Sequence, residues 1–184
     1  MSDLLQTKFN VDQVTAGSYF GAISVVSGIS LPLVGLFVDK FGHISTIMVV
    51  ANLLGLISNL MWVFLSNDCL QTESGCKSIV AVPIILMGIA NGFFVGTAWN
   101  AMVYVVPRAK VGTAYGTAGS ILGLMNSMGP VFLGWLHDHT KDVGFGYYYV
   151  NVVASWLSTF AVASAMFLYW YDLTKNEARL RINV

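Results

Sequence analysis

The sequence predicts an all-α membrane protein with five transmembrane helices. Hydrophobic residues make up 56% of its 184 residues and charged residues only 10%, whereas a soluble domain carries roughly a quarter charged residues. Five long stretches contain no Asp, Glu, Lys or Arg, and each is long enough for a membrane-crossing helix, which needs about 20 apolar residues. Backbone groups in lipid must bond within their own segment, so these stretches are expected to be helices rather than strands.

The expected spans follow one another with short polar connections. Their ranges are 15–38, 44–65, 78–106, 113–136 and 148–169. Short connections are typical of antiparallel neighbours in a helical bundle. We therefore expect residues 1–184 to form one partial transmembrane bundle.

The first span carries small residues on one helix face. They recur every three or four residues, at Gly17, Gly21, Ser24, Gly28, Pro32 and Gly35. Helices in lipid associate through close packing of such residues, because apolar side chains gain little by leaving lipid for another apolar surface. The stripe predicts a face along which this helix packs or slides against a neighbour.

The second span leads into a polar connection that holds Cys69 and Cys76. A disulfide across this short loop is plausible in an oxidising compartment, and two free thiols are the alternative.

The third span has a small face of its own at Gly88, Gly92 and Gly96. We expect this face to allow close packing as well.

The fourth span repeats the stripe of the first, 99 positions later. The repeated small residues are Gly116, Ser120, Gly123, Ser127 and Gly134, with Pro130 one place early. Spans that lie three apart cross the membrane in opposite directions, so the pattern indicates an inverted repeat, typical of secondary transporters. A chance likeness of two glycine-rich helices is the alternative. In a true repeat the third span has no earlier counterpart, which predicts a further helix before Thr15.

Orientation follows from Lys and Arg, which favour the cytosolic side. One side of the predicted bundle, including the C-terminal tail, holds Lys40, Arg108, Lys110, Lys175, Arg179 and Arg181. The other side holds Lys8, Lys77 and Lys141. We therefore expect a cytosolic C-terminus, and we place the turn after the first span in the cytosol.

That turn carries the stretch GLFVDKFGH, residues 35–43. It resembles the G-x-x-x-D-[RK]-x-G-[RK] signature of the major facilitator superfamily, with matches at Gly35, Asp39, Lys40 and Gly42. His43 departs from the basic residue usual at the last position. The resemblance implies a cytosolic gate latch, in which the Asp39 carboxylate meets the positive N-terminal end of a neighbouring helix and Lys40 balances its charge.

The run WNAMVYVVPRAKVGTAYG, residues 99–116, resembles the junction of the tenth and eleventh helices of this superfamily. It is most similar to the branch that includes lysosomal dipeptide transporters. The resemblance extends over most of the chain and implies that the five spans are helices eight to twelve of a twelve-helix carrier. Helix seven and the N-terminal half would then be missing from this chain, which would supply part of a six-helix bundle.

The resemblance also implies where solute would bind, because helices eight, ten and eleven line the central cavity in this fold. These are the first, third and fourth spans here. Their candidate solute contacts are Tyr19, Asn91, Trp99, Asn100 and Asn126. A buried amide in lipid is costly unless it is paired, and a helix–helix hydrogen bond is the alternative role for Asn91 and Asn126.

Other functional classes find little support. The nine basic and nine acidic residues give no basic surface for nucleic acid. The five spans contain no ionisable side chain for a proton relay. His137 and His139 have no third ligand at convincing spacing, so we predict no metal, and we predict no cofactor and no catalytic residue.

The leading hypothesis is transmembrane transport of a small organic solute, such as a dipeptide or a related metabolite, by alternating access. The predicted partners are the solute, the lipid bilayer and the missing N-terminal transporter half, and the predicted location is the lysosomal or plasma membrane. The alternative is an orphan membrane half that acts as an interaction protein or as a non-transporting truncated product.

Overall fold

The computed structural model describes residues 13–64, 75–140 and 146–175. They form α2 (Gln13–Phe41), α3 (Ile44–Phe64), α4 (Gly75–Val105), the 3-10 turn η2 (Arg108–Lys110), α5 (Val111–Thr140) and α6 (Gly146–Lys175). This part of the chain contains no strand, and the predicted all-α membrane fold is confirmed. Each expected span corresponds to one long helix, whereas the limits of the membrane crossings within those helices stay a prediction.

Four helices are apolar and long enough to cross a membrane. The qualifying segments are Gly17–Lys40, Ile44–Phe64, Ala81–Val105 and Tyr148–Thr174. α5 has 30 residues, which is ample length, but it is less apolar and is not one of these four segments. The fourth expected span is therefore a long helix whose membrane crossing stays a prediction.

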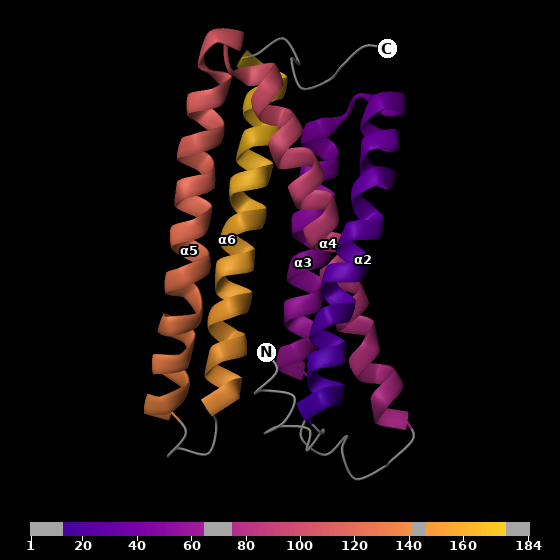
Figure 1. Ribbon diagram of the computed structural model, residues 1–184, viewed down its shortest axis with the longest axis vertical. Helices are drawn as coiled ribbons and strands as arrows, with labels where there is room; N and C mark the ends of the chain where they lie inside the picture. Colours follow the sequence, from indigo (N-terminus) through magenta and orange to yellow (C-terminus); the bar gives the residue numbers. More distant parts are fainter. Residues whose placement is uncertain (1–12, 65–74, 141–145, 176–184) are drawn as a thin grey trace.

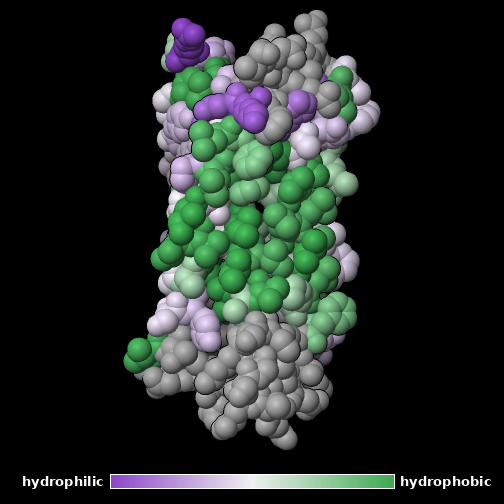
Figure 2. Space-filling view, turned by 90° about the vertical axis from the view of Figure 1, so that its right-hand side faces the viewer, coloured by the Kyte–Doolittle hydropathy of each residue, from purple (hydrophilic) through white to green (hydrophobic). Residues whose placement is uncertain are grey.

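The helices pack as two groups that meet along α3 and α6 (Figure 1). α4 packs against both α2 and α3, while α5 packs against α6. Figure 2 shows a broad band of hydrophobic side chains on one face of the molecule, with hydrophilic side chains gathered at the upper end. Large apolar side chains of the helices, such as Val25, Phe160 and Phe167, lie exposed. This outward-facing apolar surface suits a protein whose solvent is lipid.

α4 approaches α2 through glycines. A Cβ added at Gly92 would lie 2.6 Å from the Cβ of Ser30 and 2.7 Å from the carbonyl oxygen of Ser27. A Cβ at Gly88 would lie 2.8 Å from the Cβ of Val26. These helices can therefore reach their observed separation only because α4 has no side chain at these positions, as the small face of the third span predicts.

The stripes of the first and fourth spans behave differently. Added Cβ atoms would meet nothing within 4 Å at four glycines of α2 and six of α5, namely Gly17, Gly21, Gly28, Gly35, Gly112, Gly116, Gly119, Gly123, Gly129 and Gly134. α4 instead meets α2 along the face of Val26, Ser30 and Val34. Within the described residues, the two glycine stripes are open surfaces rather than interhelical contacts.

The contact between α3 and α6 is consistent with the inverted repeat. Asn59 Nδ2 donates to Ser158 Oγ at 2.8 Å, and these two positions are 99 residues apart, the offset that relates the two stripes. A residue that contacts its own repeat counterpart lies on the axis relating the repeats. In a true repeat, the pairing of α3 with α6 would be the place where the two repeats meet, and the repeat itself stays a prediction.

Candidate functional site

The C-terminal part of α2 and the residue that follows it carry the four residues that match the signature: Gly35, Asp39 and Lys40 lie in α2, and Gly42 lies in the turn to α3. α2 ends at Phe41 and α3 begins at Ile44. Between them Gly42 has φ 62°, and its N–H donates to the Val38 carbonyl oxygen at 2.8 Å. A left-handed glycine directly after a helix is a common helix stop, because glycine adopts this conformation without a Cβ clash.

The charged members of the signature lie on the outside of this turn. Asp39 and Lys40 are exposed, whereas Gly42 is buried. Among the described residues no hydrogen bond reaches the Asp39 carboxylate. The structure thus brings the signature residues together at one end of the molecule, while their action as a latch stays a prediction.

An apolar cluster packs beside this turn. Val34, Val38 and Ile44 are 0%, 3% and 0% exposed, and Phe93 and Ala101 of α4 pack against them. The turn is therefore anchored to α4, the helix that carries several of the expected solute contacts.

Asp172 on α6 is a buried charged residue that the sequence did not single out. Its side chain is 2% exposed, and Ser45 Oγ donates to its Oδ2 at 3.5 Å. Ser45, itself 1% exposed, belongs to the first turn of α3. A carboxylate close to a helix N-terminus is stabilised by the unpaired N–H groups there.

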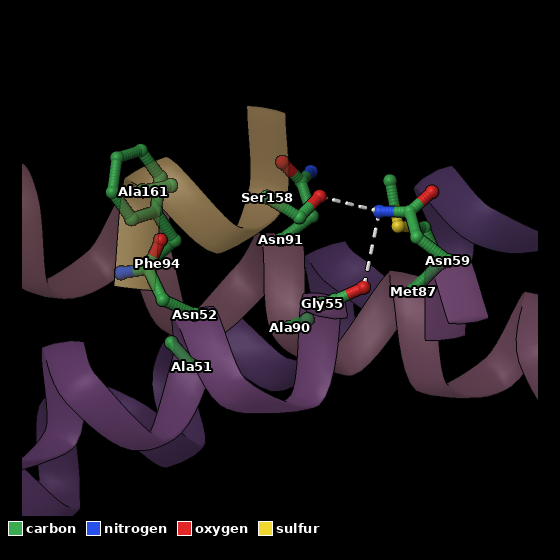
Figure 3. Close-up of a pocket in the computed structure, with 10 residues that line it drawn as sticks. All are labelled: Ala51, Asn52, Gly55, Asn59, Met87, Ala90, Asn91, Phe94, Ser158 and Ala161. Atoms are coloured by element: carbon green, nitrogen blue, oxygen red, sulfur yellow. Dashed lines mark hydrogen bonds between the residues drawn. The ribbon is translucent and has the colours of Figure 1, made fainter. Parts of the chain in front are cut away.

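A pocket of about 150 Å³ with a mostly apolar lining lies between α3, α4 and α6 (Figure 3). Its lining is Ala51, Asn52, Gly55, Asn59, Met87, Ala90, Asn91, Phe94, Ser158 and Ala161. Three carboxamides and one hydroxyl supply the polar groups, and no lining side chain is ionisable. The pocket can offer neutral hydrogen bonds in an otherwise apolar surrounding.

Internal hydrogen bonds use the amide donors around this pocket. Asn59 Nδ2 bonds both the Gly55 carbonyl oxygen and Ser158 Oγ, and both bonds are drawn in Figure 3. Asn52 Nδ2 donates to the Met48 carbonyl oxygen at 2.8 Å. The carboxamide oxygens of Asn52 and Asn59 accept no hydrogen bond within the described part of the chain, so they are available to a donor from outside it.

Asn91 is the one sequence candidate that lines the pocket. Its Nδ2 donates to Ser27 Oγ at 3.0 Å, which joins α4 to α2. The residue therefore makes the helix–helix hydrogen bond that was the alternative, and it also borders a cavity. Asn52, Asn59 and Ser158 were missed because they lie on helices that the resemblance treats as peripheral.

The remaining candidates do not gather at this pocket. The Trp99 ring stacks on Tyr115 with centroids 5.3 Å apart, and Tyr115 Oη donates to the Trp99 carbonyl oxygen at 2.9 Å. These contacts brace the connection from α4 to α5. Asn100 and Asn126 are exposed and Tyr19 is half-buried. A solute-binding role for any of the five candidates stays a prediction.

Two further expectations concern cysteines and metal. Cys69 lies among residues 65–74, outside the described residues, so its pairing with Cys76 stays a prediction. The described residues contain no group of three His, Cys, Asp or Glu side chains placed to hold a metal ion. His137 Nδ1 instead lies 3.6 Å from the Asp138 carboxylate.

Comparison with known proteins decides the family. The model of the Major Facilitator Superfamily matches residues 1–181. The chain belongs to the Major Facilitator Superfamily. This agrees with the resemblance found at residues 35–43 and 99–116, and the predicted superfamily membership is confirmed.

Relatives within the superfamily are distant transporters. The chain is 24% identical over 169 residues to the lysosomal dipeptide transporter MFSD1 of Danio rerio, covering 92% of this chain and 33% of the relative. It is 27% identical over 144 residues to monocarboxylate transporter 9 of Gallus gallus, covering 71% and 28%. The chain thus spans about a third of the length of the curated relatives it matches. No solved structure matches it.

Proposed function

We propose that this chain is the C-terminal part of a two-lobed carrier that moves a small organic solute across a membrane by alternating access. The observation that carries the proposal is the superfamily match over residues 1–181 on a bundle of apolar helices. In this mechanism the bundle rocks against a second lobe around a central solute site. The match favours this function over an orphan interaction protein.

The proposed partner is the other part of the carrier. α4 occupies the face of α2 that contains Ser27 and Ser30, and Asn91 hydrogen-bonds to Ser27. The repeat offset of 99 residues places Asn126 and Gly129 at the corresponding positions of α5. A helix outside this chain would cover α5 there, as α4 covers α2, and would supply a polar partner for Asn126.

The relatives suggest two classes of solute. One relative is named as a dipeptide transporter and another as a monocarboxylate transporter. The pocket and the candidate contacts on α2, α4 and α5 contain no Asp, Glu, Lys, Arg or His side chain. This chain would therefore contact neutral parts of the solute, and any charged group would be recognised by the other lobe. The membrane would be lysosomal or plasma membrane, with the C-terminus cytosolic.

Uptake of labelled solute tests the proposal. The complete carrier is reconstituted in lipid vesicles, and entry of a dipeptide and of lactate is measured with protein-free vesicles as the baseline. We expect saturable uptake of one solute, which Asp39→Ala reduces because the latch is lost. Asp138→Ala, an exposed acid on α5, is the matched control. Failure to exceed the baseline with either class would exclude both solutes suggested by the relatives, and unchanged uptake by Asp39→Ala would exclude the latch.

A further inference from the structure

Asp172 stands out because its neighbours in the last turns of α6 point outward. Tyr171 and Leu173 are each 43% exposed, whereas Asp172 is 2% exposed. Among the residues whose side chains the structure describes, Asp172 is the only charged residue that is buried. Burying a carboxylate is costly unless other groups stabilise its charge, so a buried acid at this position calls for a structural reason.

The first turn of α3 contacts this carboxylate. Ser45 Oγ donates to Asp172 Oδ2 at 3.5 Å, a long hydrogen bond that cannot by itself offset the burial. The bond nevertheless places the carboxylate beside the N-terminal end of α3, where the helix dipole is positive. The negative charge of the Asp172 carboxylate and the positive N-terminal end of α3 thus attract each other across a contact closed to solvent.

This contact sits beside the turn that carries the signature. Ser45 lies three residues after Gly42, and Ile44 between them is fully buried. α4 anchors the turn through the cluster around Val34 and Val38. Asp172 contacts Ser45, next to this turn, from α6, the last helix of the described chain.

From this geometry we infer that Asp172 is a positioning residue for the gate: its buried carboxylate clamps the first turn of α3 to the end of α6. The turn at residues 35–43 and the end of α6 then move as one unit. A rocking motion of the bundle is transmitted to Asp39 and Lys40 without the turn loosening. The role of the clamp in gating rests on the proposed carrier function, whereas the clamp itself does not.

Thiol labelling tests the clamp without any solute. The reporter is Ile44→Cys, placed in a chain carrying Cys69→Ser and Cys76→Ser, and maleimide is applied to permeabilised vesicles. Labelling of a buried thiol requires local opening of the turn. We expect Asp172→Ala to speed labelling about tenfold, as expected for losing a hydrogen bond to a charged group, and Asp172→Glu to restore part of the protection. Asp138→Asn, which changes an exposed acid on α5, should leave the rate unchanged.

The result that overturns the clamp is equal labelling of the parent and of Asp172→Ala. If Asp172→Ala does not fold, Asp172→Asn keeps the side-chain size while removing the charge, and an unchanged rate in that variant is equally decisive. In the complete carrier we expect Asp172→Asn to lower the turnover rate at unchanged KM, because the residue touches the turn and not the solute. An altered KM with unchanged turnover would contradict a positioning role, and absence of transport by the parent would count against the proposed function alone.

Discussion

Gly42 sets the geometry of the turn on which the signature depends. Its φ of 62° lies in the left-handed region, and the residue is buried against the bundle. Any other L-residue would hold this conformation only under strain. The chain direction from α2 into α3 therefore depends on one residue that has no side chain.

We predict that Gly42→Ala lowers the stability of the folded chain by about 1 kcal/mol, because alanine pays the left-handed strain that glycine avoids. The measurement is thermal unfolding in detergent, followed by far-UV circular dichroism. Gly35→Ala is the control, since its added Cβ would meet nothing within 4 Å. Equal melting temperatures for the two variants would contradict the prediction.

The signature residues could be identified from sequence because their spacing is local. Gly35, Asp39 and Gly42 lie close together in the sequence, and their pattern is visible without knowing how the helices pack. Asp172 offers no such signal. An acid in the last turns of a membrane helix is commonly exposed, and the contact of Asp172 with Ser45 of α3 becomes visible only in the folded structure.

The helix pair α2 and α4 shows how small residues set the distance between elements. At Gly92 an added Cβ would meet both the Ser30 side chain and the Ser27 backbone. A backbone contact cannot be relieved by rotating a side chain, so the helices themselves would have to separate.

We expect Gly92→Ala to destabilise the chain by about 1–3 kcal/mol, the usual cost of overpacking. Gly28→Ala provides the matched comparison on α2, where the added methyl group meets nothing within 4 Å. That variant should be neutral or slightly stabilising, because alanine favours the helix by about 1 kcal/mol over glycine. Urea or thermal unfolding of both variants gives the difference, and a Gly92→Ala variant as stable as Gly28→Ala would disprove the close contact.

The apolar runs of the sequence predicted where the helices lie along the chain more readily than they predicted which helices pack together. The expected range 15–38 lies within α2, which continues to Phe41 until Gly42 stops it. Hydropathy says nothing about which face of a helix meets a neighbour. For this reason the glycine stripe of α2 was expected to pack, whereas α4 uses the adjacent face with Val26 and Ser30. The pocket was missed for the same reason, since Asn52, Asn59 and Ser158 converge only after α3 and α6 pair.

The molecule as a whole is packed unevenly. α4 lies against both α2 and α3 along extensive contacts, whereas α5 has a smaller contact with α6 and meets α4 at few places. The open glycine stripe of α5 fits the proposal that a helix outside this chain covers it. A protein that lacks part of its bundle would show an imbalance of this kind.

We predict that Gly129→Leu has little effect on the stability of this chain but strongly reduces uptake by the complete carrier. No described atom lies within 4 Å of the added Cβ in the chain as it stands, whereas a covering helix would collide with a leucine there, as α2 would with a side chain at Gly92. Unfolding of the chain and vesicle uptake by the carrier are measured side by side. Val131→Leu, at an exposed position elsewhere around α5, serves as the control, and full uptake by Gly129→Leu would rule out a covering helix at this position.

The hydrogen bond from Asn59 to Ser158 has a consequence for how the two repeats differ. In an assembly of two identical three-helix units, the residue on the symmetry axis would face a copy of itself, and both copies would have to be the same amino acid. Here a carboxamide faces a hydroxyl, so the Asn59 side chain donates the hydrogen bond and the Ser158 side chain accepts it. A single chain that contains both units can thus have different residues at the two positions of this pair. A symmetric homodimer cannot, because one gene gives both copies the same residue.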